Sequence, residues 1–133
     1  MFEPTHNTTR TWGFRFSRAD AITIGVIGCA AVGLCHLGSP LWWLLLIAAG
    51  HFFLFCNVFR IVRRREFIWA GLFVLNVGIW TWFERLTWSN VLLCQLPITV
   101  ALIAADMRSS GYHGVFAGRL NPRLADYLEG RNP

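Results

Sequence analysis

Four polar side chains lie inside long apolar stretches of this sequence, and they are the residues best placed to do chemistry. They are His51, Asn57, Asn76 and Gln95. A polar group inside the hydrocarbon of a membrane is costly unless it has a partner, so each one marks a candidate functional position. Each also has a plainer interpretation as a hydrogen-bonding group between two helices, which contributes about 0.6 kcal/mol on average.

His51 is the strongest candidate of the four. It follows Ala48, Ala49 and Gly50 near the middle of its stretch. It lies roughly 12 Å from the Phe59 end of that stretch, and Asn76 lies at a similar depth in the next one. We therefore expect Asn76 to hydrogen-bond one ring nitrogen of His51 and to leave the other nitrogen free.

A free imidazole nitrogen at that depth is a candidate ligand for the metal of a tetrapyrrole. On this interpretation His51 is the cofactor-binding residue, and Asn76 orients it by a hydrogen bond to the ring nitrogen that does not bind the metal. The alternatives are a structural histidine, which we favour, and a proton carrier. We therefore expect no bound cofactor, with a tetrapyrrole at His51 as the alternative.

The remaining reactive residue types exclude several classes of protein. The four cysteines form no C-x-x-C pair, so they are expected to be small apolar residues rather than a redox site. Small four-helix exporters resemble this chain in size and span number, but they depend on a membrane-embedded carboxylate. Asp20 and Glu66 fall just outside the apolar stretches, so that mechanism is not expected. No nucleophile–base pair or metal cluster is visible, and we predict that the protein is not an enzyme.

Four apolar stretches must position these side chains. They cover residues 21–37, 41–59, 67–83 and 88–105, and none contains aspartate, glutamate, lysine or arginine. A helix needs about 20 mostly apolar residues to cross a bilayer. The chain is 55% hydrophobic and only 14% charged, unlike a soluble domain. We expect an all-α, polytopic membrane protein with four transmembrane helices.

Arginine is distributed unevenly around these stretches. If both termini lie inside, eleven of the twelve arginines are cytoplasmic and only Arg85 is outside. Short loops rich in arginine stay in the cytoplasm, so the pattern predicts both ends there. We expect an integral protein of the bacterial cytoplasmic membrane. The cytoplasmic arginines are Arg10, Arg15, Arg18, Arg60, Arg63, Arg64, Arg65, Arg108, Arg119, Arg123 and Arg131.

The same bias accounts for the net charge of +5, so nucleic acid is not an expected partner. The loop between the second and third stretches concentrates four of the arginines. Basic residues at a membrane surface attract anionic headgroups, by about 1 kcal/mol each. We therefore predict that this loop, with Arg60, Arg63, Arg64 and Arg65, contacts anionic lipids.

Small residues recur every four positions along the first stretch. They are Ala21, Gly25, Cys29 and Gly33, and helical spacing places them on one face. Such a face lets two helices approach closely in lipid. We expect it to contact another helix of this chain, with a partner subunit as the alternative.

Two polar segments flank the transmembrane domain, which covers residues 21–105. Residues 1–20 form a cytoplasmic or interfacial segment, and residues 106–133 form a cytoplasmic tail. Asn121 as a cap and Pro122 in the first turn predict a short interfacial helix over residues 122–129. A helix this short needs a surface to lie on. Its predicted docking face consists of Leu120, Leu124, Tyr127 and Leu128.

These features favour a non-catalytic accessory or structural subunit of a larger membrane complex, such as a photosynthetic or respiratory one. Its expected partners are other integral subunits, or further copies of itself, and anionic lipids. The first alternative is a small oligomeric channel or transporter with a polar path through His51, Asn57 and Asn76. The second is a haem- or (bacterio)chlorophyll-binding subunit that uses His51.

The predicted topology can be tested by labelling cysteines from outside intact cells. A cysteine placed at Ser39 or Thr87 should react, because both loops are expected on the outer face. A cysteine placed at Ser110 should not react. Strong labelling at Ser110 would overturn the topology.

Overall fold

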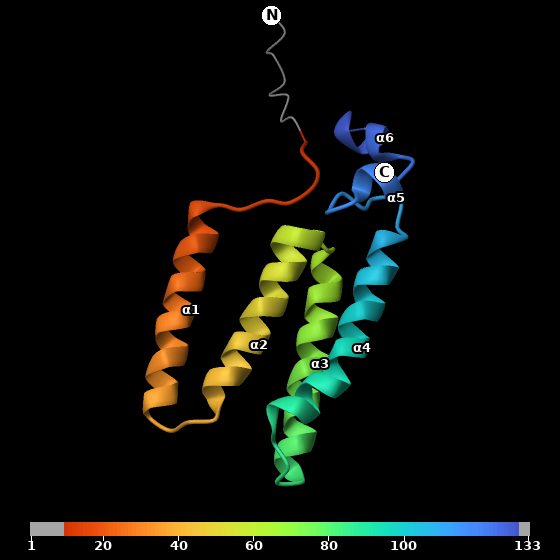
Figure 1. The fold of residues 1–133 in the computed structure, drawn as a ribbon. Coiled ribbons are helices and arrows are strands. Elements are labelled where there is room, and N and C mark those ends of the chain that lie inside the picture. The colour runs from red at the N-terminus through yellow and green to blue at the C-terminus, as the bar shows by residue number, and fades with distance from the viewer. Residues whose placement is uncertain (1–9, 131–133) are drawn as a thin grey trace, which may run out of the picture.

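The computed structural model describes residues 10–130, and no strand occurs between them. The N-terminal nine residues and residues 131–133, including Arg131, lie outside the described part. The all-α prediction is confirmed for residues 10–130 (Figure 1). The elements in chain order are α1 (Arg18–His36), α2 (Leu41–Phe53), the π-helical segment η1 (Leu54–Phe59), α3 (Arg63–Trp82), α4 (Trp88–Met107), α5 (Ala117–Leu120) and α6 (Leu124–Leu128).

Within the described residues, three helical segments are long and apolar enough to cross a membrane. They are Arg18–His36, Leu41–Phe59 and Trp88–Met107. The third helix, α3, is 20 residues long, but its first turn carries three arginines and a glutamate. Large apolar side chains are exposed along all four long helices, which suits a lipid environment. The structure is therefore that expected of an integral membrane protein.

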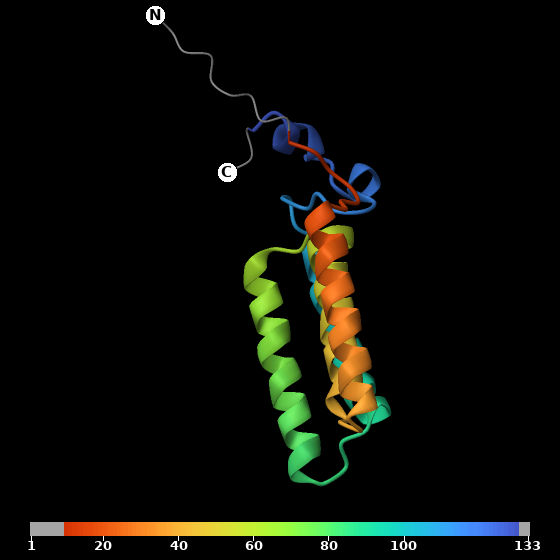
Figure 2. The same cartoon turned by 90° about the vertical axis from the view of Figure 1, so that its left-hand side faces the viewer.

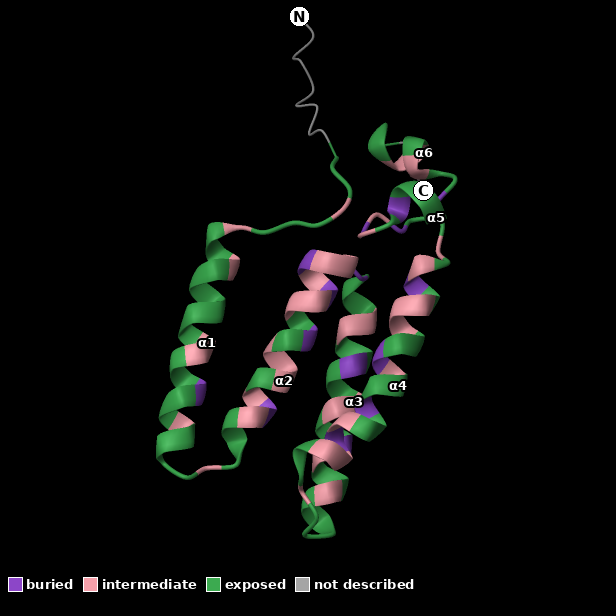
Figure 3. Ribbon diagram, in the orientation of Figure 1, coloured by how far each residue is buried: buried purple, intermediate pink, exposed green. Residues whose placement is uncertain are grey.

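The long helices are arranged as two antiparallel hairpins. Helices α1 and α2 form the first and α3 and α4 the second, and the views in Figures 1 and 2 agree on this. The hairpins meet where α2 and η1 contact α4. Phe55, Ile61 and Trp69 form the buried apolar cluster beside this contact. Figure 3 shows that α1 is mostly exposed, while buried residues gather on α2, α3 and α4.

Two of the helices begin before the apolar stretches that mark them in the sequence. Helix α1 begins at Arg18 because Ser17 forms a capping box: Ser17 Oγ accepts from Asp20 N and Asp20 Oδ2 accepts from Ser17 N. Helix α3 begins at Arg63, four residues before its expected start. Asp20 and Glu66 therefore lie inside helices. Both residues still fall outside the apolar stretches, as expected, because hydropathy marks the apolar part of a helix and not its first turn.

The second long helix ends in a π-helical turn. Residues Leu54–Phe59 form η1, which stops at Arg60 in the left-handed conformation with φ of 48°. Ile61 N closes this end by donating to Phe55 O at 2.8 Å. The Arg60 side chain donates to Thr11 O at 2.6 Å. The end of η1 is thereby attached to the N-terminal segment.

The N-terminal segment and the tail lie together at one end of the helices, which we call the arginine-rich end (Figures 1 and 2). Gly13 N donates to His113 O at 3.0 Å, and Val115 N donates to Val58 O at 2.9 Å. The His113 ring stacks on Tyr127 with 4.5 Å between centroids. Residues 10–17 and 109–130 thus form one cap over this end.

The short tail helix begins later than predicted. It runs over Leu124–Leu128, two residues inside the expected start at 122. Arg123 occupies the cap position of α6, but Asn121 Oδ1 accepts from Arg123 N, a local bond of the predicted kind, while the buried Asn121 amide donates to Ser110 O and Tyr112 O. The Asn121 side chain therefore combines a local bond with two tertiary ones.

The predicted docking face of the tail is only partly free. Leu120 and Leu128 are 47% and 37% exposed. Leu124 is half-buried, and Tyr127 is occupied by the stack on His113 and by the guanidinium of Arg10, 5.4 Å from its ring centroid. Docking through this face remains a prediction, carried now by the two exposed leucines.

Tyr112 and Gly114 hold the tail against η1. The buried Tyr112 hydroxyl donates to Val115 O at 2.6 Å, and burial raises its pKa to about 12, so it keeps this proton at ordinary pH. A Cβ at Gly114 would collide with the Phe59 carbonyl. Only glycine allows this close approach of two backbones.

We expect Gly114→Ala to release the tail from η1, since the Phe59 carbonyl cannot move without disturbing the π-helical turn. Overpacking of this kind costs about 1–3 kcal/mol. Hydrogen exchange of residues 109–128 should rise. Gly78→Ala, which meets open space on α3, is the matched control and should leave exchange unchanged. An unchanged tail in Gly114→Ala would contradict the close-approach argument.

Candidate functional site

His51 lies in an aromatic cluster built by three elements. Its ring comes from α2, stacks on Trp69 of α3 with 4.7 Å between centroids, and meets the edge of Phe55 from η1. His51 Nδ1 is 2.8 Å from Ile47 O, the carbonyl one turn earlier. A carbonyl only accepts, so Nδ1 donates this bond and the neutral ring keeps its lone pair on Nε2.

Asn76 does not support His51 as expected. Its amide donates to Val91 O at 2.9 Å and to Gln95 Oε1 at 3.2 Å, both on α4. The predicted His51–Asn76 hydrogen bond was therefore wrong, because both side chains bond to other residues. His51 lies level with Trp69, which is seven residues before Asn76 on α3, so the expected match in depth was wrong. Asn76 faces α4 and His51 faces the Trp69 ring.

Polar side chains connect α3 and α4 through a continuous set of hydrogen bonds. Gln95 Nε2 donates to Trp69 O at 3.5 Å, and Trp69 Nε1 donates to Thr99 Oγ1 at 2.9 Å. Thr99 Oγ1 in turn donates to Gln95 O at 2.9 Å. Together with Asn76 these residues form what we call the α3–α4 polar network. Gln95 and Thr99 are almost wholly buried in it.

A second polar cluster lies at the arginine-rich end and joins α1, η1 and α3. With its amide oriented to satisfy its neighbours, Asn57 Nδ2 donates to Asp20 Oδ2 at 3.1 Å and to Arg15 O at 2.9 Å. Cys56 Sγ donates to Glu66 Oε1 at 3.2 Å. Asn57 thus fastens α1 to η1. Asn57 does not line a common polar path with His51 and Asn76, because those two side chains contact other partners.

The loop arginines divide into two pairs. Arg65 forms an ion pair with Asp106 at 2.8 Å, in which the side chains are 29% and 2% exposed. Arg60 is bound to Thr11 O. Arg63 and Arg64 are exposed, so they are the two that remain suited to lipid headgroups. The role of Asp106 was not predicted, although its position at the end of the last apolar stretch, level with the loop arginines, could have indicated it.

The small-residue face of α1 has no partner among residues 10–130. Ala21, Gly25, Cys29 and Gly33 are all exposed, and a Cβ at Gly25 or Gly33 would meet nothing within 4 Å. The side of α1 that approaches α2 carries Ile27, Gly28 and Ala31 instead. The expected contact of the small-residue face with another helix of this chain was therefore wrong.

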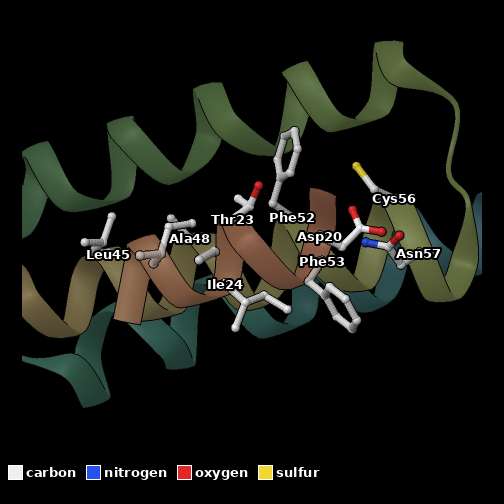
Figure 4. A pocket seen from close by; sticks show the side chains of 11 residues that line it. Asp20, Thr23, Ile24, Leu45, Ala48, Phe52, Phe53, Cys56 and Asn57 are labelled. Atoms are coloured by element: carbon white, nitrogen blue, oxygen red, sulfur yellow. The ribbon is translucent and has the colours of Figure 1, made fainter. Parts of the chain in front are cut away.

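A cavity of about 410 Å³ lies between α1 and α2 (Figure 4). Its wall is mostly apolar, and the polar side chains of Asp20, Cys56 and Asn57 lie together at one end. The sequence offered no signal for this cavity, because it depends on the separation of two helices.

No known protein family, curated protein or solved structure matches this chain. Among the described residues, no group of three histidine, cysteine or acidic side chains could hold a metal ion.

The α3–α4 polar network can be tested with a double-mutant cycle on Asn76→Leu and Gln95→Leu. Each single change leaves a buried partner unsatisfied and should cost about 1–2 kcal/mol of unfolding free energy. The double variant should cost less than the sum, since both partners are removed together. Unfolding in mixed detergent micelles gives the free energies. Cys94→Leu, at an exposed position of α4, is the control and should be neutral. Strict additivity would contradict the network.

Proposed function

We propose that this protein is a non-catalytic accessory subunit that packs against another integral membrane subunit through the exposed face of α1. The observation that carries the proposal is the poor coverage of this helix. Its spanning window is 6% buried, against 22% for each of the other two candidate spans. A helix in a four-helix chain that is covered on one side only has most of its surface available to a partner.

The residue types on that face support a protein partner over lipid. Small residues let another backbone come close, so that dispersion contacts accumulate along the whole helix. Lipid chains gain nothing from small residues, because they cover bulky side chains equally well. Ala21, Gly25, Cys29 and Gly33 extend over most of the length of α1, which suits a helix of similar length.

The polar side chains favour an accessory role over a channel. A channel needs polar groups that face one common path. Here His51, Asn57 and Asn76 each make a different contact between elements of the chain: His51 stacks on Trp69, Asn57 bonds to Asp20 and Asn76 bonds to Val91 O. Every buried side-chain nitrogen and oxygen of the described residues has a hydrogen-bonding partner. The buried polar groups therefore hold the helices together, and they do not line a common path.

We further propose that α3 is a fourth span and that both termini lie in the cytoplasm of a bacterial cell. Helix α3 lies beside α4 and runs antiparallel to it (Figure 1). Its charged first turn, the N-terminal segment and the tail share the arginine-rich end, where Arg63 and Arg64 would meet anionic headgroups. Arg85 lies in the loop between α3 and α4 at the other end.

Gly25→Leu combined with Gly33→Leu tests the accessory role. Both side chains would extend into open space, so the fold should persist while the close helix contact is lost. After gentle solubilisation of native membranes, the unaltered protein should migrate with partner subunits identified by mass spectrometry. The double variant should migrate at the mass of the free chain.

Ala30→Leu is the matched control, since Ala30 is exposed on another side of α1 and should leave the assembly intact. Two outcomes would count against the proposal. One is that the unaltered protein migrates alone under the mildest conditions. The other is that the double variant retains every partner.

A further inference from the structure

The cavity between α1 and α2 has the form of a site for an amphiphile. Its volume of about 410 Å³ is within the range of small-molecule sites, which is roughly 300–1,000 Å³. Its apolar wall includes Ile24, Leu45, Ala48 and Phe53. Figure 4 places Leu45 and Ala48 toward one end of the cavity and the polar cluster at the other.

The length and orientation of the cavity match one leaflet of a bilayer. Leu45 and Asn57, which line its two ends, are twelve residues apart. Twelve residues of helix extend roughly 18 Å, which is on the order of half the ~30 Å hydrocarbon thickness. The polar end coincides with the arginine-rich end of the helices. A molecule in the cavity would have its chain in the membrane and its head at the surface.

The head-group position is built around the carboxylate of Asp20. Oδ2 accepts from Ser17 N and Ser17 Oγ, both at 2.7 Å, and from Asn57 Nδ2 at 3.1 Å. These three donors hold the carboxylate in place, and Oδ1 accepts no hydrogen bond from the described residues in these contacts. Asp20 Oδ1 is therefore a fixed acceptor at the polar end of an apolar cavity.

The chemistry of this end selects the kind of head group. An ionised carboxylate only accepts hydrogen bonds, so it prefers a donor that is positively charged. The rings of Phe52 and Phe53 also line the cavity, and aromatic faces attract cations. Arg15, whose charge acts on Asp20, is exposed and would be available to a phosphate beside the ammonium group.

We propose that the α1–α2 cavity binds an amphiphile with a primary ammonium head group, which donates to Asp20 Oδ1 while its chain lies along α1 and α2. The ammonium group has two sources, an aminophospholipid of the bilayer or a free long-chain amine. The proposal does not depend on the accessory role.

The test measures binding to the delipidated full chain by native mass spectrometry. Phosphatidylethanolamine, phosphatidylcholine and phosphatidylglycerol with identical chains are compared. Phosphatidylethanolamine should bind about tenfold more tightly than phosphatidylcholine, whose quaternary ammonium cannot donate a hydrogen bond. Phosphatidylglycerol should bind more weakly still, since its head group has no cation. Dodecylamine against dodecanol is the second arm, and an amine preference in that arm alone assigns the site to a free amine.

Two variants separate the head-group contact from the cavity. Asp20→Asn keeps an acceptor for Ser17 but removes the charge, and it should abolish the ammonium preference. Glu84→Gln, a matched change in the loop at the far end of the helices, should preserve it. Ala48→Leu fills the cavity and should weaken every ligand about tenfold or more. Ala70→Leu, at an exposed alanine of α3, should not.

Ala48→Leu leaves the Asp20 cap intact, so it provides a test even if Asp20→Asn fails to fold. The proposal is overturned if neither ammonium ligand is preferred by the unaltered protein. It is also overturned if the preference survives in a folded Asp20→Asn, or if Ala48→Leu leaves binding unchanged. Equal binding of all three phospholipids, together with equal binding of dodecylamine and dodecanol, would indicate a lipid-filled groove without a head-group site.

Discussion

Hydrocarbon contains no water, so every polar side chain between the helices must find its partner inside the protein. The α3–α4 polar network meets this requirement with Asn76 and Trp69 on one helix and Gln95 and Thr99 on the other. Hydrogen bonds are directional, whereas apolar contacts in lipid are not. The network therefore sets how α3 and α4 are rotated against each other. Trp69 then offers its ring face to His51, which orients α2.

A second set of polar contacts closes the arginine-rich end. The ion pair of Arg65 with Asp106 joins the start of α3 to the end of α4, and Val115 bonds the tail to η1. Asp106 is buried, and a buried charge is tolerated only with a partner. These contacts draw α2, α3 and α4 together beneath the cap.

Helix α1 is attached to the rest of the chain by fewer contacts. Asn57 bonds to Asp20 and to the backbone of Arg15 at one end, and the short loop at Ser39 connects the other end to α2. Between these points α1 is only partly covered. Its exposed small-residue face, on which the proposed subunit contact rests, and the cavity beside α2, on which the proposed amphiphile site rests, both follow from this incomplete packing.

Some of the helix limits and capping residues predicted from the sequence agree with the structure and others do not, and each case has a physical reason. The second stretch ends at Phe59 and the fourth begins at Trp88, as hydropathy predicted, because apolar length is recorded directly in the sequence. Ser17 and Asp20 form a recognisable capping box, so the start of α1 at Arg18 was accessible to sequence reasoning, although hydropathy alone hid it. The sequence indicated the local bond of Asn121 to the backbone two residues on, but not its bonds to Ser110 and Tyr112, which depend on the fold of the tail.

The sequence by itself determined the helical class and the approximate limits of the apolar segments, because hydropathy is a property of a single helix. Only the tertiary structure decided which faces meet. His51 and Asn76 were predicted to bond to each other, yet His51 stacks on Trp69 and Asn76 bonds to α4. The small residues of α1 were placed on one face, yet that face meets no helix of the described chain. Rotation about a helix axis is set by bonds between helices, and no single stretch of sequence contains that information.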